Sequence, residues 1–419
     1  MSETTFNLST LNLAAGTYSI TVKAKAEGYT DSDASNAVNY TAAAPIPTDC
    51  ILFKGETSDF TLKATNKSWN GTVEYSTDKN TWSTWDGSEI TSANKKLYLR
   101  GKNNTTFYTT NVAKLVLSEK AGCYGNINTL LDYENPPTAV AERYCYQSMF
   151  QDCTLLTTAP ELPATTLASN CYTQMFRGCT SLTTAPALPA TTLASSCYNS
   201  MFQGCTSLTT APELPATTLA SGCYAQMFLG CISLATAPEL PATTLANYCY
   251  QSMFQGCTSL TTAPELPATT LTEYCYYQMF YGCTKLVSAP ALPATTLASG
   301  CYENMFQDCT SLTTAPALPA TTLADYCYRE MFYGCTSLTT APELPATTLK
   351  TRCYQSMFFK CTGLKISATR TGEYTTAWRI PSAGTIAAEA SSWNRDMLKN
   401  TGGTFKANPS INTTYYIAG

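Results

Sequence analysis

A 26-residue motif repeats nine times between Cys145 and Cys361, and it constrains the fold more than any other feature of the chain. Its third copy is CYNSMFQGCTSLTTAPELPATTLASG, which begins at Cys197. The first cysteine of the motif recurs at positions 145, 171, 197, 223, 249, 275, 301, 327 and 353, so nothing is inserted or deleted. A fixed period of this length indicates stacked units that bury their apolar faces against one another. The chain is therefore expected to form a solenoid over residues 145–364.

Apolar residues within one repeat follow two patterns. Cys197, Met201 and Cys205 lie four residues apart, which predicts a helical stripe of about two turns. The leucines that follow are expected to face inward from an extended segment. Pro212 and Pro215 each remove a backbone donor from that segment, so its strand should be short or irregular.

The repeat also carries a family signature. The pattern Cys-Tyr-x-x-Met-Phe-x-Gly-Cys-Thr-Ser-Leu resembles the BspA-like leucine-rich repeats of bacteria, in which an aromatic residue precedes Gly-Cys and a Leu-rich strand follows. The resemblance extends over all nine units, although the period is longer than is common and Ala-Pro replaces the usual β-branched strand residue. It implies an α+β repeat solenoid of the leucine-rich-repeat-like kind, with nine 26-residue repeats.

The repeats contain 18 of the 20 cysteines, and Cys50 and Cys123 are the others. On a helix, Cys197 and Cys205 would lie about 12 Å apart, beyond the roughly 7 Å that a disulfide spans between Cα atoms. Bridges between equivalent cysteines of neighbouring coils cannot pair all nine positions. A metal site is not expected, because the chain has no histidine and no Cys-x-x-Cys motif. The favoured interpretation is two ladders of buried thiols that pack as small apolar residues in a reducing environment.

Residues 1–44 alternate like β-strands. The pattern LAAGTYSITVKA at 13–24 resembles the last three strands of a fibronectin type III or related Ig-like domain. The front half of such a sandwich is missing, which leaves an open edge and an uncovered face. We therefore expect a docking segment that another chain or the next domain completes, and the alternative is a small three-stranded appendage. Its apolar docking residues would be Phe6, Leu8, Tyr18, Ile20 and Val22.

Residues 45–120 are expected to form an all-β, sandwich-like domain behind a short proline-containing linker. The segment from Ser76 to Trp82 resembles the Asp-box turn of sialidase-type propellers, but it is one residue short and occurs once. A hairpin turn with packed tryptophans is the favoured interpretation. The alternative is a glycan platform made of Trp82 and Trp85.

The ends of the solenoid need atypical units to cover their apolar layers. Residues 121–144 are expected to be the N-terminal cap. Residues 365–419 lose the period and are expected to be a small C-terminal cap with a helix from Glu389 to Lys399.

Differences among the nine copies indicate the solvent-facing positions. One of them is the strand position after Ala-Pro, which is Glu or Ala. The others fall before the first cysteine, between the tyrosine and the methionine, and after the phenylalanine, on the side of the expected helix. Aromatic groups there suit recognition, although neutral drift on a solvated face explains the same variation. The candidate recognition surface comprises Arg177, Leu229, Tyr248, Tyr274, Tyr277, Tyr281, Tyr326, Arg329 and Tyr333.

Composition excludes several classes of function. Charged residues make up 13% of the chain, the net charge is −4, and no basic patch indicates nucleic acid. The first residues do not form a secretory signal, and no apolar run is long enough to span a membrane. No catalytic constellation, phosphate loop or cofactor motif is present, and glutamates such as Glu213 and Glu239, one coil apart, are interpreted as a solvated row. An enzyme is therefore not expected.

The start without a leader, the partial Ig-like piece and the near-identical repeats together resemble proteins encoded by bacteriophages of gut bacteria. That resemblance implies a virion protein, a head or tail appendage, fibre or decoration protein docked to other virion proteins through its N-terminal segment. The solenoid would then face a host surface protein or glycan, as part of an oligomer or a large assembly. The alternative is a bacterial cell-surface BspA-like adhesin that binds host or glycan ligands.

Overall fold

The computed structural model describes residues 16–20, 38–42 and 46–418. The chain divides into two compact units, residues 1–48 and residues 49–419. In the first unit, β1 (Gly16–Ile20) pairs antiparallel with β2 (Val38–Ala42). Of the expected docking residues, Tyr18 and Ile20 lie on β1, whereas Phe6, Leu8 and Val22 lie outside the described residues.

The second unit begins with two sheets and a single turn of 3₁₀-helix, η2 (Ile127–Leu130). The larger sheet has the strand order β12-β10-β3-β8-β5-β6. Its strands are β3 (Ile51–Gly55), β5 (Thr72–Ser76), β6 (Ser83–Thr84), β8 (Lys96–Lys102), β10 (Ala121–Tyr124) and β12 (Leu156–Thr158). The smaller sheet, in the order β7-β4-β9, consists of β4 (Thr61–Ala64), β7 (Ile90–Thr91) and β9 (Leu115–Leu117). Strand β8 buries every second residue, so one face of the larger sheet joins the core.

The larger sheet continues into the solenoid. Strand β10 lies antiparallel to β3 on one side and parallel to β12, which belongs to the first repeat, on the other. Two aromatic side chains of the sheet region lie on the first coil. Phe107 stacks on Tyr146 with ring centroids 5.8 Å apart, and Phe53 contacts Phe150 at 6.4 Å. The first apolar layer is therefore covered by the sheet region as well as by part of 121–144.

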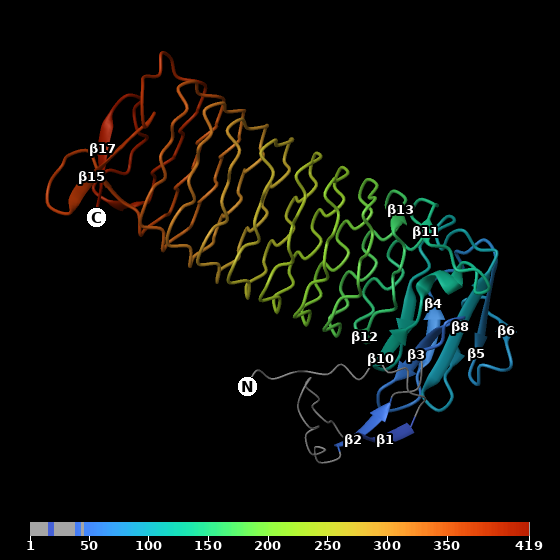
Figure 1. The fold of residues 1–419 in the computed structure, drawn as a ribbon. Coiled ribbons are helices and arrows are strands. Elements are labelled where there is room, and N and C mark those ends of the chain that lie inside the picture. The colour runs from blue at the N-terminus through green and yellow to red at the C-terminus, as the bar shows by residue number, and fades with distance from the viewer. Residues whose placement is uncertain (1–15, 21–37, 43–45, 419) are drawn as a thin grey trace, which may run out of the picture. The chain divides into compact units, whose positions relative to one another are not determined.

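The nine coils then stack along one axis (Figure 1). The helix expected in each coil is wrong. In the third coil, Ser196, Ser200 and Gly204 have φ values of 54°, 53° and 72°, which no α-helix contains. Equivalent left-handed residues recur at the same three positions in the other coils, so this side of the coil is a run of tight turns.

Hydrogen bonds explain how the run of turns is held. Alternate amides donate within the coil, as Met201 N does to Tyr198 O at 3.2 Å. The intervening amides donate to the next coil, as Phe202 N does to Met227 O at 2.9 Å. Every backbone donor in the run is thereby satisfied without a helix. The four-residue spacing of Cys, Met and Cys reflects one left-handed residue in every four, a period too close to that of a helix for sequence to separate.

The other two sides of each coil are extended but irregular. Neighbouring coils are joined there by single parallel bridges between threonines one period apart, such as Thr184 with Thr210 and Thr218 with Thr244. Paired strands occur at the two ends: near the start β11 (Ala139–Val140) lies parallel to β13 (Thr166–Leu167), and at the end the strand over Lys365–Ser367 pairs with the C-terminal segment. The prolines remove donors from these segments, as expected from the sequence.

Identical residues form continuous ladders inside the solenoid. Nine tyrosines, from Tyr146 to Tyr354, stack with ring centroids 5.7 to 5.9 Å apart. Nine phenylalanines, from Phe150 to Phe358, stack at 5.4 to 5.7 Å. All 20 cysteines are buried and free, so the two thiol ladders are confirmed. The second cysteine of most coils donates to a carbonyl of the preceding coil, as Cys205 Sγ does to Phe176 O at 3.0 Å.

The C-terminal segment forms a four-stranded sheet in the order β15-β17-β14-β16. Its strands are β14 (Lys365–Ser367), β15 (Tyr374–Arg379), β16 (Gly402–Gly403) and β17 (Thr414–Ala418). The helix expected over Glu389–Lys399 is also wrong. Residues 391–400 form a tenth run of turns, in which Ser392, Asp396 and Asn400 are left-handed and Trp393 O accepts from Tyr354 N at 2.8 Å.

Candidate recognition surface

The side chains of the turn run form one face of the solenoid, which we call the turn face. In the third coil it comprises residues 195–204, and in each neighbouring coil the residues 26 positions away. All nine residues of the expected recognition surface lie on this face, because they occupy the variable positions of the turn run. The helix-side surface expected from sequence is therefore a surface of turns.

Three of the expected tyrosines form a contiguous cluster in the fifth and sixth coils. Tyr248 and Tyr274 stack with ring centroids 5.4 Å apart and an interplanar angle of 2°. Tyr277 meets Tyr274 edge-on at 5.8 Å. Tyr248 is 40% exposed, and the ring of Tyr274 lies over Gly300 in the seventh coil, where any Cβ would clash with it. The cluster therefore depends on glycine at position 300.

The remaining expected residues are spread along the face. Tyr326 lies beside Arg352, whose guanidinium carbon is 5.7 Å from the ring centroid. A separate row at the other edge of the run carries a large, partly buried side chain in every second coil. Its members are Arg177, Leu229, Tyr281 and Tyr333.

A buried acid that was not expected from the sequence lies beside Tyr274 and Tyr277 of the tyrosine cluster. Glu303 is 6% exposed and accepts a hydrogen bond from Arg329 Nη1 at 2.9 Å. Arg329 Nη2 also donates to Glu330 Oε1 at 2.9 Å. Burial raises the pKa of Glu303 to about 7, although the guanidinium of Arg329 draws it down. The sequence does contain a sign of this ion pair. Glu303 and Arg329 are 26 residues apart, which places them side by side on adjacent coils.

Hydrogen bonds between serine and glutamine side chains also join the first six coils in three pairs. The central left-handed position is serine in the first, third and fifth coils and glutamine in the second, fourth and sixth. Each serine donates to the glutamine of the following coil: Ser148 to Gln174, Ser200 to Gln226 and Ser252 to Gln278. The Oγ to Oε1 distance is 3.1 Å in the middle pair. Over the first six coils, the side chains at this position therefore repeat every two coils, whereas the backbone repeats every coil.

The two tryptophans do not form an exposed platform. Trp85 is 2% exposed, stacks on Trp69 at 5.3 Å and donates Nε1 to Ser88 O at 2.7 Å. Trp82 is half-buried, and the guanidinium of Arg100 lies 4.0 Å from its ring centroid. The turn before them connects β5 to β6, so the hairpin interpretation holds and a glycan platform that includes Trp85 is wrong.

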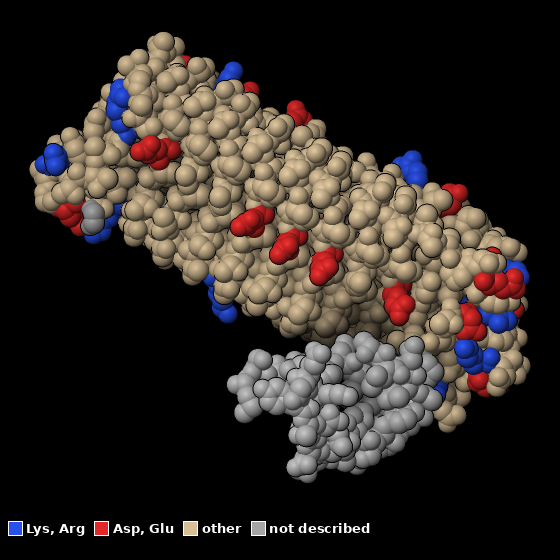
Figure 2. Space-filling model, in the orientation of Figure 1, with Lys and Arg blue, Asp and Glu red and all other residues tan. Residues whose placement is uncertain are grey.

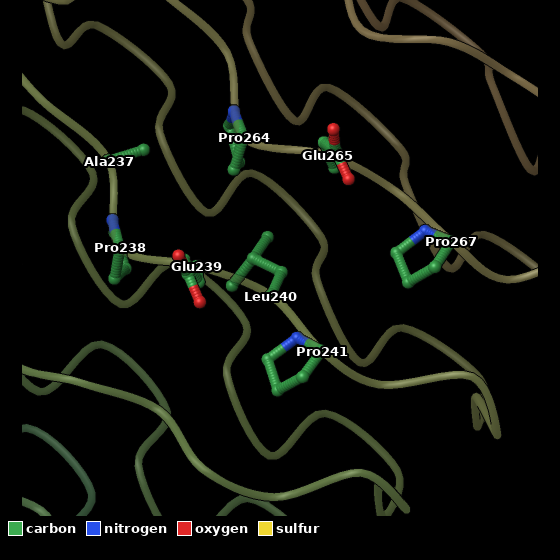
Figure 3. Close-up of a pocket in the computed structure, with 8 residues that line it drawn as sticks. All are labelled: Ala237, Pro238, Glu239, Leu240, Pro241, Pro264, Glu265 and Pro267. Atoms are coloured by element: carbon green, nitrogen blue, oxygen red, sulfur yellow. The ribbon is translucent and has the colours of Figure 1, made fainter.

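A second face carries the Pro-Glu-Leu-Pro segments. Figure 2 shows acidic side chains spaced along this side of the solenoid, where Glu213, Glu239 and Glu265 occupy the same exposed position in successive coils. Glu239 and Glu265 border a hollow between their coils, each between two prolines (Figure 3). Their carboxylates are exposed and at equivalent positions, which makes them a solvated row and not an acid–base pair.

The described residues include neither a metal-binding group of side chains nor a membrane-spanning helix. No three His, Cys, Asp or Glu side chains among them are grouped so that they would hold a metal ion. Over the same residues, no helix has the length and apolar character needed to cross a membrane.

Comparison with known families supports the sequence signature. The family model for the BspA type leucine-rich repeat region matches residues 143–261 and 224–365 in 6 copies, which together cover more than half of the chain. Neither curated proteins nor solved structures gave a match. Repeats of this family are in general non-enzymatic, and they indicate a repeat protein of the surface or adhesion kind. With its nine stacked coils, the chain belongs to the BspA-type leucine-rich repeat family.

Proposed function

We propose that this protein is a non-enzymatic attachment protein whose solenoid recognises a surface ligand through the turn face. The observation that carries the proposal is the cluster of Tyr248, Tyr274 and Tyr277 on that face. Aromatic side chains are enriched where interfaces gain most of their binding energy. The interior of the coils is nearly invariant, and many of the differences between copies lie on this surface.

The scaffold suits such a role. Alternate amides bind the next coil along the whole turn run, so the backbone that carries the tyrosines is ordered before any ligand arrives. A preorganised surface loses less conformational entropy on binding than a loop does. The stacking of Tyr248 on Tyr274 further fixes both rings.

The test is attachment of the full chain to host cells, measured by flow cytometry with labelled protein. Replacing Tyr248, Tyr274 and Tyr277 by serine should reduce binding at least tenfold. A matched control replaces Glu213, Glu239 and Glu265 on the separate Pro-Glu face by alanine, and it should bind like the unmodified protein. Loss in the control with no loss in the tyrosine variant would place recognition on the other face.

The proposal also concerns the carrier of the solenoid, that is, the particle or cell on whose surface the protein is mounted. We place it on a bacteriophage particle, as a head or tail appendage held to other virion proteins by residues 1–44. The open-edged strand pattern of that segment and the near-identical repeats support this placement. Mass spectrometry of purified virions should detect the chain. Deleting residues 1–44 should prevent incorporation without unfolding the solenoid, and unchanged incorporation would refute the docking role.

A cell-surface adhesin is the second candidate, and the family match favours it, since such repeats indicate bacterial surface proteins. Both carriers use the same turn face. Fractionation of the producing bacterium separates them: an adhesin is found in the cell envelope in the absence of phage particles. A virion protein sediments with the particles.

A further inference from the structure

Aromatic and basic side chains meet on the turn face at the C-terminal end of the solenoid. Tyr333 and Phe359 stack with ring centroids 4.9 Å apart and an interplanar angle of 10°. Lys360 Nζ lies 5.4 Å from the ring centroid of Tyr333, and Lys399 Nζ lies 5.7 Å from that of Phe359. We call these four residues the aromatic–basic cluster. Lys399 comes from the tenth run of turns, so the cluster exists only once that run is stacked on the ninth coil.

Positive charge is concentrated at this end of the solenoid. Residues 145–349 contain three cations, Arg177, Lys285 and Arg329, whereas residues 350–365 contain four, of which Lys365 pairs with Glu373 at 3.2 Å. Within the described part of the chain, Lys360 and Arg352 have no carboxylate at ion-pair distance. Lys399 and Arg395 share one, that of Asp396, at 3.4 and 3.7 Å. The cluster therefore has an excess of positive charge on a protein that is otherwise slightly acidic.

The carboxylate of Asp308, in the seventh coil, limits the basic region on the side of the earlier coils. Asp308 lies near Tyr281 in the preceding coils, and it adds to burial in raising the pKa of that phenol. Its carboxylate lies over Gly334. The carboxylate of Asp308 thus lies at the boundary of the eighth coil, and an anionic group is favoured on the side of Lys360 and Lys399.

The row that contains Tyr333 alternates over the first eight coils, and the ninth coil continues it with Phe359. The same position is glutamine at 151, 203, 255 and 307, and arginine, leucine or tyrosine at 177, 229, 281 and 333. Two coils span roughly 10 Å if each rises by about one strand spacing. That span is close to the length of one disaccharide unit in an extended, β-linked polysaccharide. A linear ligand with two alternating units would therefore place the same unit near the non-glutamine residue of this row at every second coil up to Tyr333.

We propose that the aromatic–basic cluster is a binding site for a linear anionic glycan with an acidic group on alternate sugars. A sugar ring packs on the Tyr333–Phe359 pair, and its carboxylate or sulfate binds Lys360 and Lys399. The inference rests on the proposed function, because it names the chemical class of ligand for the turn face. Nucleic acid fits less well, since its charge density requires more phosphate contacts than this region and Asp308 allow.

The test measures binding of the full chain to four probes by titration calorimetry at low and high salt. The probes are a hyaluronan octasaccharide, which carries carboxylates, a heparin octasaccharide, which carries sulfates, a neutral cello-oligosaccharide and single-stranded DNA. At least one of the two acidic glycans should bind, and its affinity should fall as salt screens the lysines. The two glycan arms distinguish carboxylate from sulfate recognition.

Variants separate the parts of the site. Replacing Lys360 and Lys399 by alanine should weaken glycan binding at least tenfold. Tyr333→Gln should do so as well, and it introduces the residue that the first, third, fifth and seventh coils carry at this position, so the fold is retained. Lys285→Ala, an exposed lysine outside the turn face, is the matched control and should bind normally.

Three results would overturn the proposal: equal binding of the neutral glycan, tighter binding of DNA than of either acidic glycan, or unchanged glycan binding in the lysine variant. Failure of the glycan proposal is distinct from failure of the proposed function. If no acidic glycan binds but the Tyr248, Tyr274 and Tyr277 variant still loses cell attachment, the attachment role stands and the ligand class is wrong. If that variant also attaches normally, the turn face is not the recognition surface.

Discussion

At the scale of single residues, the unusual feature of this protein is how many side chains other than glycine have a left-handed backbone. Ser200, Gln226 and Tyr274 have φ values of 53°, 57° and 53°. Such a conformation costs roughly 1–2 kcal/mol for a residue with a Cβ. The cost is offset by the backbone bond to the next coil, such as Gln226 N to Gln251 O at 2.7 Å.

The conformation at Gln226 leads to a first prediction. Gln226→Gly should change the free energy of unfolding by no more than about 1 kcal/mol, since glycine gains at positive φ what it loses with the Ser200 hydrogen bond. Gln226→Val should destabilise by roughly 2 kcal/mol or more, because a β-branched residue is a severe outlier there. Thermal unfolding followed by circular dichroism compares the two. Equal midpoints for both variants would contradict a left-handed residue at this position.

The buried acid leads to a second prediction, on pH. Unfolded, Glu303 titrates near the ordinary value of 4.5, whereas in the folded chain its pKa is about 7. Between these values the unfolded state releases the proton and the folded state keeps it, so stability falls as pH rises through this window. The loss is on the order of 3 kcal/mol at most.

The variant Glu303→Gln should therefore be closer in stability to the unmodified protein at pH 5 than at pH 8, where it should be the more stable of the two. Thermal midpoints at both pH values measure this difference. Glu239→Gln, at an exposed position, is the matched control and should show no such dependence. An unchanged pH profile for Glu303→Gln would mean that Glu303 is ionised throughout.

At the scale of elements, each run of turns presents the same tyrosine, methionine, phenylalanine and cysteine to its neighbours. Identical side chains on adjacent coils stack because the coils are in register, and the stacks end on different aromatics. Trp393 meets Tyr354 edge-on at 6.2 Å, and Trp378 meets Phe358 at 6.4 Å. The irregular C-terminal segment therefore closes both ladders with tryptophan.

The thiol ladders lead to a third prediction. Burial raises the pKa of Cys205 to about 12 and that of Cys275 to about 11, so their reactive thiolate forms are rare at neutral pH. The native protein should expose fewer than one reactive thiol per chain to an aromatic disulfide reagent, and all 20 after denaturation. Ser195→Cys places a thiol at an exposed turn-face position and should react rapidly. Rapid reaction of several native thiols would contradict the buried ladders.

At the scale of the whole molecule, the coils are close to interchangeable, and a fourth prediction follows. Deleting residues 197–248 removes two full periods and rejoins a glutamine coil to a serine coil, so it should leave a folded protein. Deleting residues 197–235, one and a half periods, should abolish folding because the ladders lose register. Soluble yield and near-ultraviolet circular dichroism distinguish the outcomes. A folded product of the second deletion would show that register is not required.

The sequence by itself determined the period, the number of copies and the residues of the core. Identical apolar residues at a fixed spacing leave stacking as the way to bury them, so the ladders of Tyr, Phe and Cys could be anticipated from the repeats. The sequence also identified the variable positions of the turn face. Free thiols were expected for a partly wrong reason, since the segment between Cys197 and Cys205 is not a helix.

Only the tertiary structure decided how the turn run is built and which of its residues meet. A four-residue spacing is compatible with a helix and with repeated left-handed turns, and the bonds that select the turns connect residues 25 positions apart, in different coils. Stacking brings Glu303 to Arg329, and Lys399 to Phe359. Packing against Trp69 buries Trp85, which sequence left open. The period fixes what each coil must bury, whereas the contacts between coils determine the surface that they present.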